Sequence, residues 1–276
     1  MRAPRATSAY RIANEQLTLA LTLLLVGGIV VVSAAATLCG SLLLVLAMLA
    51  LSFQMTRNHH LALVRQSIPV TPARTPQLTR LVQECRLKLQ PGEIETYVTP
   101  SRMLNAYTFG VSSPKVVVLY SSLLDVMDAD ELRFIVGHEM GHVRLGHTWL
   151  NSMIGGLAGV PSPFIVAALL ALAFRSWNRS CEFSADRAGL LACGKPEKAI
   201  TALIKLVAPQ AASSPQAMQR VYQMLDAQDE HPGQVLAELV ATHPLMIRRL
   251  EMLQRYANTE EYRRLQALVD SNLSPA

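Results

Sequence analysis

The pattern of charged and hydrophobic positions divides the chain into an apolar N-terminal part and a mixed remainder. No charged residue occurs from Leu17 to Phe53, a run longer than one membrane crossing of about 20 residues and just long enough for two short helices. We therefore expect residues 1–56 to form a transmembrane helical hairpin that turns near Ser33–Ala36 or near Cys39–Ser41. A cleaved signal peptide is the alternative, but the apolar run continues well beyond the alanines that resemble a cleavage site.

The remainder, residues 57–276, alternates between helical and extended patterns. We expect it to form one domain that is mainly α with a small β element, and we expect residues 54–76, where this domain begins, to be a basic linker. Pro76 suits the first position of a helix, and apolar residues recur at helical spacing as far as Leu89. Extended segments are expected at Ile94–Thr99 and Val116–Tyr120, with a short strand or a turn at Leu104–Gly110.

Two later helices are predicted with clear ends. Asp128 is an expected N-cap with Glu131 as its capping-box partner, and a second helix should run from Arg175 to about Ala192. Between them the apolar stretch Trp149–Phe174 is interrupted at Pro161–Pro163 and is too short for two full crossings, which need about 40 residues. We expect this stretch to form a shallow membrane-associated hairpin or to pack against the N-terminal hairpin. Further helices should follow, with breaks at Pro209, Pro215, Pro232 and Pro244.

Composition supports a membrane location. Hydrophobic residues make up 51% of the chain and charged residues only 16%, against about 25% in average soluble proteins. The net charge of +5 comes partly from arginines on both flanks of the apolar run, as expected for ends that face the cytoplasm. No nucleic-acid motif accompanies this charge. The four cysteines form no CxxC pair, so they indicate neither a disulfide framework nor a zinc knuckle.

The central motif is His138-Glu139-Met140-Gly141-His142. On a helix, residues four apart differ by about 40° around the axis, so the two imidazoles can hold one Zn²⁺ from the same side. Glu139 lies on the same turn and can take the proton of a metal-activated water that attacks a carbonyl. The other residues of this helix are largely apolar, and two buried histidines without a partner would be costly. The pattern therefore favours a catalytic zinc site over a solvated helix face.

A catalytic zinc needs a third protein ligand. Glu182 is the stronger candidate, because Asp186 follows four residues later and could hold a ligand histidine by its free ring nitrogen. A solvated acidic face is the alternative for these two carboxylates. His147 follows His142 by five residues, which on a continuous helix would place it about 140° away from the metal side. We expect His147 to be a helix-end residue or a support for the ligands, with a plain surface histidine as the alternative.

Four groups of residues between positions 105 and 249 occur in an order that is typical of one peptidase family. They are Asn105-Ala106-Tyr107, the stretch from Asp130 to His142, Arg179 with Glu182 and Asp186, and Thr242-His243-Pro244 followed by Arg248 or Arg249. In this set the chain resembles the HtpX-like and CaaX-prenyl-protease-type zinc metallopeptidases, which are integral-membrane gluzincins. It departs from them between HExxH and the glutamate, where typical HtpX-like members carry two full membrane segments.

The resemblance implies roles for individual residues. It implies that His138, His142 and Glu182 are the zinc ligands. Glu139 is implied to be the general base, and Asp186 and Arg179 are implied to support the ligands. It also implies that Asn105, Ala106 and Tyr107 form an edge strand that pairs with substrate, with a mere turn as the alternative. His243 is implied to stabilise the oxyanion, and a helix N-terminal histidine is the alternative for it.

We therefore expect a zincin-type metalloendopeptidase with one Zn²⁺ per chain, which hydrolyses peptide bonds. The resemblance implies membrane or misfolded proteins as substrates, a role in membrane-protein quality control, and the bacterial inner membrane with the catalytic domain facing the cytoplasm. The partners expected are protein or peptide substrates and the lipid bilayer, without nucleic acid, and the oligomeric state is left open. The alternative is a catalytically silent scaffold or chaperone-like adaptor that retains a peptidase fold, although the intact Glu139 and Glu182 argue against it.

Overall fold

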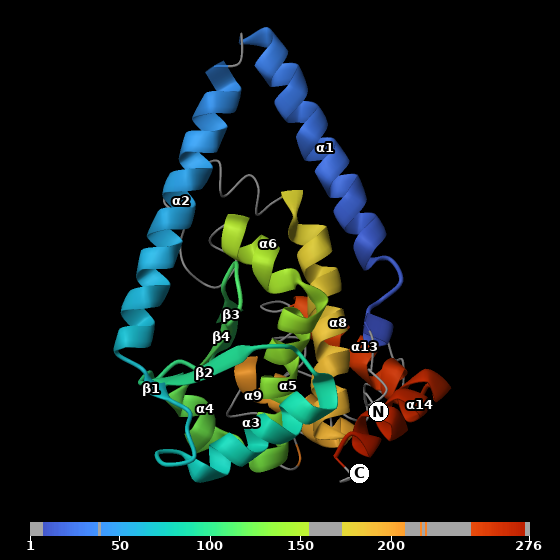
Figure 1. Cartoon of the computed structure of the whole chain (residues 1–276). Helices are drawn as coiled ribbons and strands as arrows, with labels where there is room; N and C mark the ends of the chain where they lie inside the picture. Colours follow the sequence, from blue (N-terminus) through green and yellow to red (C-terminus); the bar gives the residue numbers. More distant parts are fainter. Residues whose placement is uncertain are drawn as a thin grey trace.

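The computed structural model describes residues 8–37, 40–154, 173–207 and 244–273, together with residues 216 and 219. Two long helices converge at one end and diverge towards a helical body that carries a small sheet (Figure 1). The described part of the chain is mainly helical with one four-stranded sheet, which confirms the fold class that the sequence predicts.

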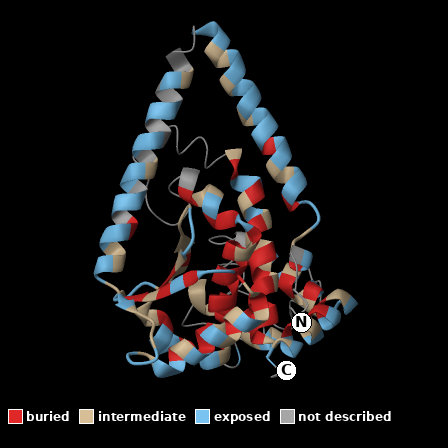
Figure 2. Cartoon of the chain, viewed as in Figure 1, coloured by how far each residue is buried: buried red, intermediate tan, exposed pale blue. Residues whose placement is uncertain are grey.

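The long helices are α1 (Glu15–Ala36) and α2 (Gly40–Arg65), and the 3-10 helix η1 (Ser8–Tyr10) precedes them. They occupy the uncharged run and are mostly exposed along their length (Figure 2). Among the described helices, α1 is the one that is long and apolar enough to cross a membrane. The prediction of a linker over residues 54–76 is wrong for its first part, because α2 continues to Arg65. No glycine or proline after Gly40 interrupts this helix, and the next proline is Pro69.

The sheet lies on one side of the body and has the strand order β1-β2-β4-β3. Its strands are β1 (Ile68–Pro69), β2 (Ile94–Thr99), β3 (Ala106–Phe109) and β4 (Lys115–Tyr120). β2 and β4 are parallel, and β3 runs antiparallel to β4. The segment between the two predicted strands is thus a short strand rather than a turn, and it forms an edge of the sheet.

The helix predicted to start at Pro76 is α3 (Pro76–Leu89), and it buries its apolar stripe in the body. It ends at Gln90, which has a left-handed φ of +48°, directly before Pro91. The short helix α4 (Ser121–Val126) connects β4 to the helix that carries the central motif.

That helix is α5 (Ala129–Leu145), and its start is the predicted capping box. The Asp128 carboxylate accepts from the backbone N–H of Glu131, and the Glu131 carboxylate accepts from the backbone N–H of Asp128 at 2.8 Å. α5 ends at Gly146, whose φ of +82° is a value that L side chains rarely adopt. The chain then turns into α6 (His147–Ile154), which leaves in a new direction (Figure 1).

At the centre of the body α5 packs against α8 (Arg175–Cys193), and most residues of both helices are buried (Figure 2). Glycines allow these two helices to approach closely. A Cβ atom at Gly141 would lie 2.6 Å from Cβ of Ala188, and one at Gly189 would lie 2.7 Å from the backbone oxygen of Phe134. No side chain fits into such gaps, so the small residues set the distance between the central motif and the acidic residues of α8.

In the described part of the C-terminal region, three helices complete the body: α9 (Pro196–Val207), α13 (Pro244–Ala257) and α14 (Glu260–Ser271). α9 packs against α5 and α8, and α13 packs against α8 and α9. The predicted break at Pro244 is the start of α13. Most of the apolar stretch 149–174, including its predicted turn, lies outside the described residues, as do the breaks predicted at Pro209, Pro215 and Pro232.

Candidate active site

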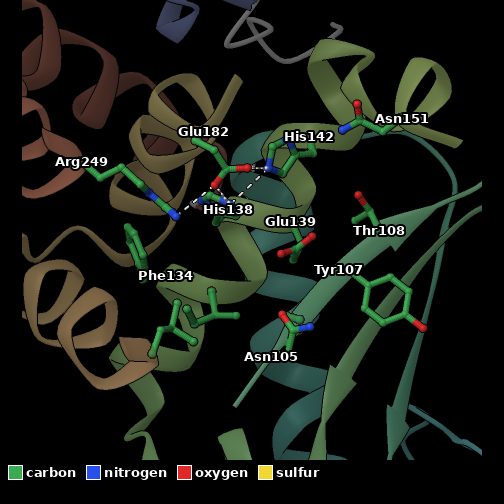
Figure 3. A pocket seen from close by; sticks show the side chains of 13 residues that line it. Asn105, Tyr107, Thr108, Phe134, His138, Glu139, His142, Asn151, Glu182 and Arg249 are labelled. Atoms are coloured by element: carbon green, nitrogen blue, oxygen red, sulfur yellow. Dashed lines mark hydrogen bonds and ion pairs between the residues drawn. The ribbon is translucent and has the colours of Figure 1, made fainter. Parts of the chain in front are cut away.

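Three side chains from α5 and α8 converge on one point. His138 and His142 lie one turn apart on α5, and Glu182 reaches both of them from α8 (Figure 3). The Nε2 atoms of the two histidines are 3.2 Å apart. Oε2 of Glu182 lies 3.5 Å from Nε2 of His138, and its Oε1 lies 3.4 Å from Nε2 of His142. The structure thus brings together the three residues that the sequence selects as metal ligands.

These separations fit a tetrahedral metal ion. Bonds of about 2.0–2.1 Å at tetrahedral angles place neighbouring ligand atoms about 3.3 Å apart, close to the observed 3.2, 3.4 and 3.5 Å. Two imidazoles and one carboxylate are also a donor set that leaves a fourth position open in catalytic sites. The residues present therefore suit a bound metal ion.

Each histidine uses its Nδ1 atom elsewhere, which leaves Nε2 available to a metal. Nδ1 of His138 lies 3.0 Å from Oδ1 of Asp186. An ionised carboxylate can only accept a hydrogen bond, so Nδ1 carries the proton and Nε2 keeps its lone pair. Nδ1 of His142 lies 3.0 Å from Nδ1 of His147. Both rings are therefore oriented by a partner on the side away from the metal group.

An arginine from α13 holds the two acidic side chains. Arg249 donates from Nε and Nη2 to the two oxygens of Asp186 at 2.8 and 2.7 Å, and its Nη1 lies 3.0 Å from Oε2 of Glu182. Burial opposes ionisation of both carboxyls, but the guanidinium holds the pKa of Asp186 below its usual value and that of Glu182 well below. Both groups are therefore ionised at neutral pH, as metal ligation requires.

Glu139 points into a pocket beside the two histidines, on the side of β3 (Figure 3). Its side chain is buried with 6% exposure, and this burial raises the pKa of its carboxyl. A carboxylate whose pKa is raised towards the working pH is a better acceptor of a proton than an exposed one. Glu139 is therefore suited to take up a proton next to the metal group.

The pocket has a volume of about 300 Å³ and extends from the metal group to β3. Asn105, Ala106 and Tyr107 all line it, together with Thr108. β3 pairs with β4 along one edge, and no described strand pairs with the other. The centroid of the Tyr107 ring lies 6.1 Å from that of the Phe109 ring.

The model of peptidase family M48 matches residues 72–257, which is more than half of the chain. This chain belongs to peptidase family M48. It is therefore a metallopeptidase, as the sequence predicts, and a metal is implied by the family as well as by the donor set.

Individual relatives support the HtpX-like assignment. The chain is 28% identical over 218 residues to a protease HtpX homolog of Paenarthrobacter aurescens, covering 68% of this chain and 75% of that protein. It is 27% identical over 223 residues to a protease HtpX homolog of Sulfurihydrogenibium sp., covering 65% and 75%. It is 31% identical over 146 residues to the plastoglobule-localized metallopeptidase 48, chloroplastic, of Arabidopsis thaliana. That match covers 51% of this chain but only 42% of the plant protein.

His147 is part of this M48 site and is not a surface histidine. It is 1% exposed, and its Nδ1 contacts His142. The angle expected for a continuous helix does not apply, because α5 ends at Gly146 and the chain turns back towards the motif. Burial lowers the pKa of His147 to about 4, so its ring is neutral at physiological pH.

One other expected site residue of the M48 domain lies away from the site. Arg179 is exposed on α8, and the guanidinium that holds Asp186 comes from Arg249 on α13 instead. An arginine from a separate helix can reach both carboxylates from the side, whereas Arg179 extends towards solvent. His243 lies outside the described residues. Glu15 is not among the predicted site residues, although it is the sole acidic residue before Glu84 and stands two positions before the apolar run.

Proposed function

We propose that this M48 metallopeptidase is a membrane-anchored zinc endopeptidase with one Zn²⁺ per chain. His138, His142 and Glu182 would hold the zinc, and Glu139 would serve as the general base. The observation that carries this proposal is the set of three ligand-atom separations of 3.2 to 3.5 Å, with the Nδ1 atom of each histidine engaged elsewhere. The M48 membership supports the same chemistry.

The chain's own groups have separate tasks in this reaction. A bound zinc supplies Lewis acidity that lowers the pKa of water and polarises a peptide carbonyl. Glu139 takes the proton of the attacking water and delivers it to the leaving amine, which its buried position and raised pKa favour. Asp186 keeps the His138 ring in one tautomer and orientation, and Arg249 keeps Asp186 and Glu182 ionised.

We propose that substrate binds as an extended strand along β3. Asn105, Ala106 and Tyr107 line the pocket beside Glu139, and the edge of β3 that no described strand covers can form main-chain hydrogen bonds with a peptide. A peptide paired in this way continues on both sides of the scissile bond, as an endopeptidase requires. Because the recognition is through the backbone, it suits unfolded segments of many sequences, which agrees with misfolded or membrane proteins as substrates.

The membrane anchor is proposed from α1 and α2. α1 has 22 residues, so it is about 33 Å long and matches the hydrocarbon core of a bilayer. Large apolar side chains are exposed along it, among them Leu24 at 72% and Val32 at 71%. An exposed apolar surface of this size is unfavourable in water and marks a membrane or protein contact. We propose the bacterial inner membrane, with the catalytic domain towards the cytoplasm, and a role in membrane-protein quality control.

The test uses full-length protein purified in detergent. Zinc content by atomic absorption and cleavage of casein would be measured for wild type, Glu139→Gln, Glu182→Ala and the control Glu251→Gln, which alters an exposed carboxylate on α13. We expect one zinc per chain and cleavage in wild type and control. Glu139→Gln should keep its zinc and lose cleavage by at least about 100-fold, because it removes the base. Glu182→Ala should lose zinc and activity together.

Other outcomes would change the proposal in defined ways. Equal cleavage by Glu139→Gln and wild type would show that the activity belongs to a contaminant. Zinc without any cleavage in wild type, on casein and on a membrane protein in liposomes, would favour the scaffold or adaptor. Retention of full zinc by Glu182→Ala would remove Glu182 from the ligand set.

A further inference from the structure

A carboxylate from the start of α1 is buried next to the metal group. Glu15 is the first residue of α1 and is 0% exposed, whereas most of the helix after it is exposed. Its Oε1 lies 2.9 Å from Nε2 of His147, and its Oε2 accepts a hydrogen bond from the Ser184 hydroxyl. Arg11 forms an ion pair with Glu15 and also donates to the backbone oxygen of Leu145 at 2.7 Å. The N-terminal segment is therefore fastened to both α5 and α8 at this point.

The hydrogen bonds between Glu15 and the metal group can run in one direction only. Glu15 as a carboxylate accepts, so Nε2 of His147 must donate to it. Nδ1 of His142 and Nδ1 of His147 are 3.0 Å apart, so one of them donates to the other. A ligand histidine carries its proton on the nitrogen that does not bind the metal, so Nδ1 of His142 donates and Nδ1 of His147 accepts. Nε2 of His142, the atom that faces His138 and Glu182, then keeps its lone pair.

We propose that Glu15 is a positioning residue for the zinc site, acting on His142 through His147. The proposal rests on the role of His142 as a zinc ligand under the proposed function. It makes the two histidines equivalent in their support: His138 is held by Asp186 directly, and His142 is held by Glu15 through one additional imidazole. A carboxylate placed behind a ligand histidine fixes the ring and increases its basicity.

This arrangement gives the N-terminal helix a second task besides anchoring. The residue that completes the support of His142 stands where α1 leaves the body, and Arg11 and Ser184 hold it there. The backbone N–H of Ile12 also donates to the Ser184 hydroxyl at 3.1 Å. Displacement of α1 from the body would therefore withdraw Glu15 from His147 and loosen one zinc ligand.

A second metal ion is the competing interpretation of the same residues. Glu15, His147 and Cys181 place one ligand atom each within 4.8 Å of one another. The hydrogen bonds argue against an ion there, because both ring nitrogens of His147 are already engaged, by His142 and by Glu15.

The test measures zinc affinity of detergent-purified full-length protein by competition with a chromophoric chelator. The variants are Glu15→Ala, His147→Ala, the double variant, Glu15→Gln, and the control Gln16→Ala, an exposed neighbour on α1. We expect Glu15→Ala and His147→Ala each to raise the zinc dissociation constant by roughly 10- to 100-fold. In the double variant the second substitution should add nothing, because both act on one chain of hydrogen bonds. Glu15→Gln should retain most of the affinity, since its amide oxygen still accepts from His147.

The visible absorption spectrum of the Co²⁺-substituted protein gives a readout that does not depend on activity. A shift of its bands in Glu15→Ala, reversed in Glu15→Gln, would support a changed ligand geometry at His142. Wild-type zinc affinity and an unchanged cobalt spectrum in Glu15→Ala would overturn the positioning role while leaving the proposed function intact. Additive losses in the double variant would indicate that Glu15 only fastens the N-terminal segment and would also overturn it.

The stoichiometry separates the remaining cases. Two zinc ions in wild type, with one lost in Glu15→Ala, would replace the positioning role by the second metal site. Absence of zinc from wild type would overturn the proposed function and, with it, the role of Glu15. One zinc in wild type and in Gln16→Ala, bound more weakly in Glu15→Ala, is the result expected.

Discussion

The close approach of α5 and α8 can be tested by adding one carbon atom at Gly141. A Cβ there would lie 2.6 Å from Cβ of Ala188 and 3.3 Å from Cα of Ala185. Carbon atoms pack at about 3.5–4.0 Å, so Gly141→Ala requires the helices to separate by about 1 Å at this point. Metal–ligand distances tolerate only about 0.2 Å, so Glu182 would no longer meet His142 in the geometry of the site.

Two effects of this substitution oppose each other. Alanine in place of glycine inside a helix stabilises the helix by roughly 0.5–1 kcal/mol. An additional carbon in a packed interface costs about 1–3 kcal/mol. The steric effect should dominate, because the obstructing atoms of Ala188 and Ala185 are a Cβ and a backbone Cα, which cannot rotate away. We expect a net loss of about 1–2 kcal/mol in unfolding free energy and a weakening of zinc affinity by about tenfold or more.

Thermal unfolding of the metal-free protein and zinc titration would measure the two effects separately. Gly27→Ala in α1 is the matched control, since no atom lies within 4 Å of a Cβ placed there, and it should be neutral or slightly stabilising. If Gly141→Ala unfolds at the wild-type temperature and binds zinc with wild-type affinity, the glycine contact does not set the distance between the helices.

Three further predictions follow from contacts around the site. Asp128→Ala removes the N-cap of α5 and should destabilise the protein by about 1 kcal/mol in thermal unfolding at pH 7. Burial opposes ionisation of Asp128, but hydrogen bonds from Lys198 and the backbone lower its pKa. The loss of unfolding free energy in Asp128→Ala should therefore be complete above about pH 5 and should disappear as the pH falls below about 4. Arg249→Met leaves the buried Asp186 and the half-buried Glu182 without their cation and should cost about 3–5 kcal/mol. It should also raise the pKa of Glu182, so zinc binding should be lost at a higher pH than in wild type, and equal pH profiles would contradict this role. Cys85 is fully buried and burial raises its pKa to about 12, so iodoacetamide should modify it only after unfolding; rapid labelling of the native protein would contradict this burial.

Much of the fold follows from local patterns that the sequence displays directly. The capping box at Asp128, Pro76 at the start of α3 and the alternating strand β2 were all predicted within a residue or two, because caps, proline and periodicity act over a few neighbouring residues. The HExxH spacing likewise places His138 and His142 on one face of a helix without tertiary information. The end of α2 was missed, since no local signal stops that helix where the apolar run ends.

The residues of the sequence therefore indicated the family through their resemblance to it, and they predicted a metal site in which the motif pairs with Glu182. Tertiary structure decided which partners stand behind the ligands. Arg249 rather than Arg179 holds Asp186, and Glu15, 132 residues from His147 in sequence, completes the support of His142. Helical spacing could not reveal either contact, because each depends on how separate helices pack and on the left-handed turn at Gly146. Contacts between distant segments are set by the packing of the whole body, and no local pattern encodes them.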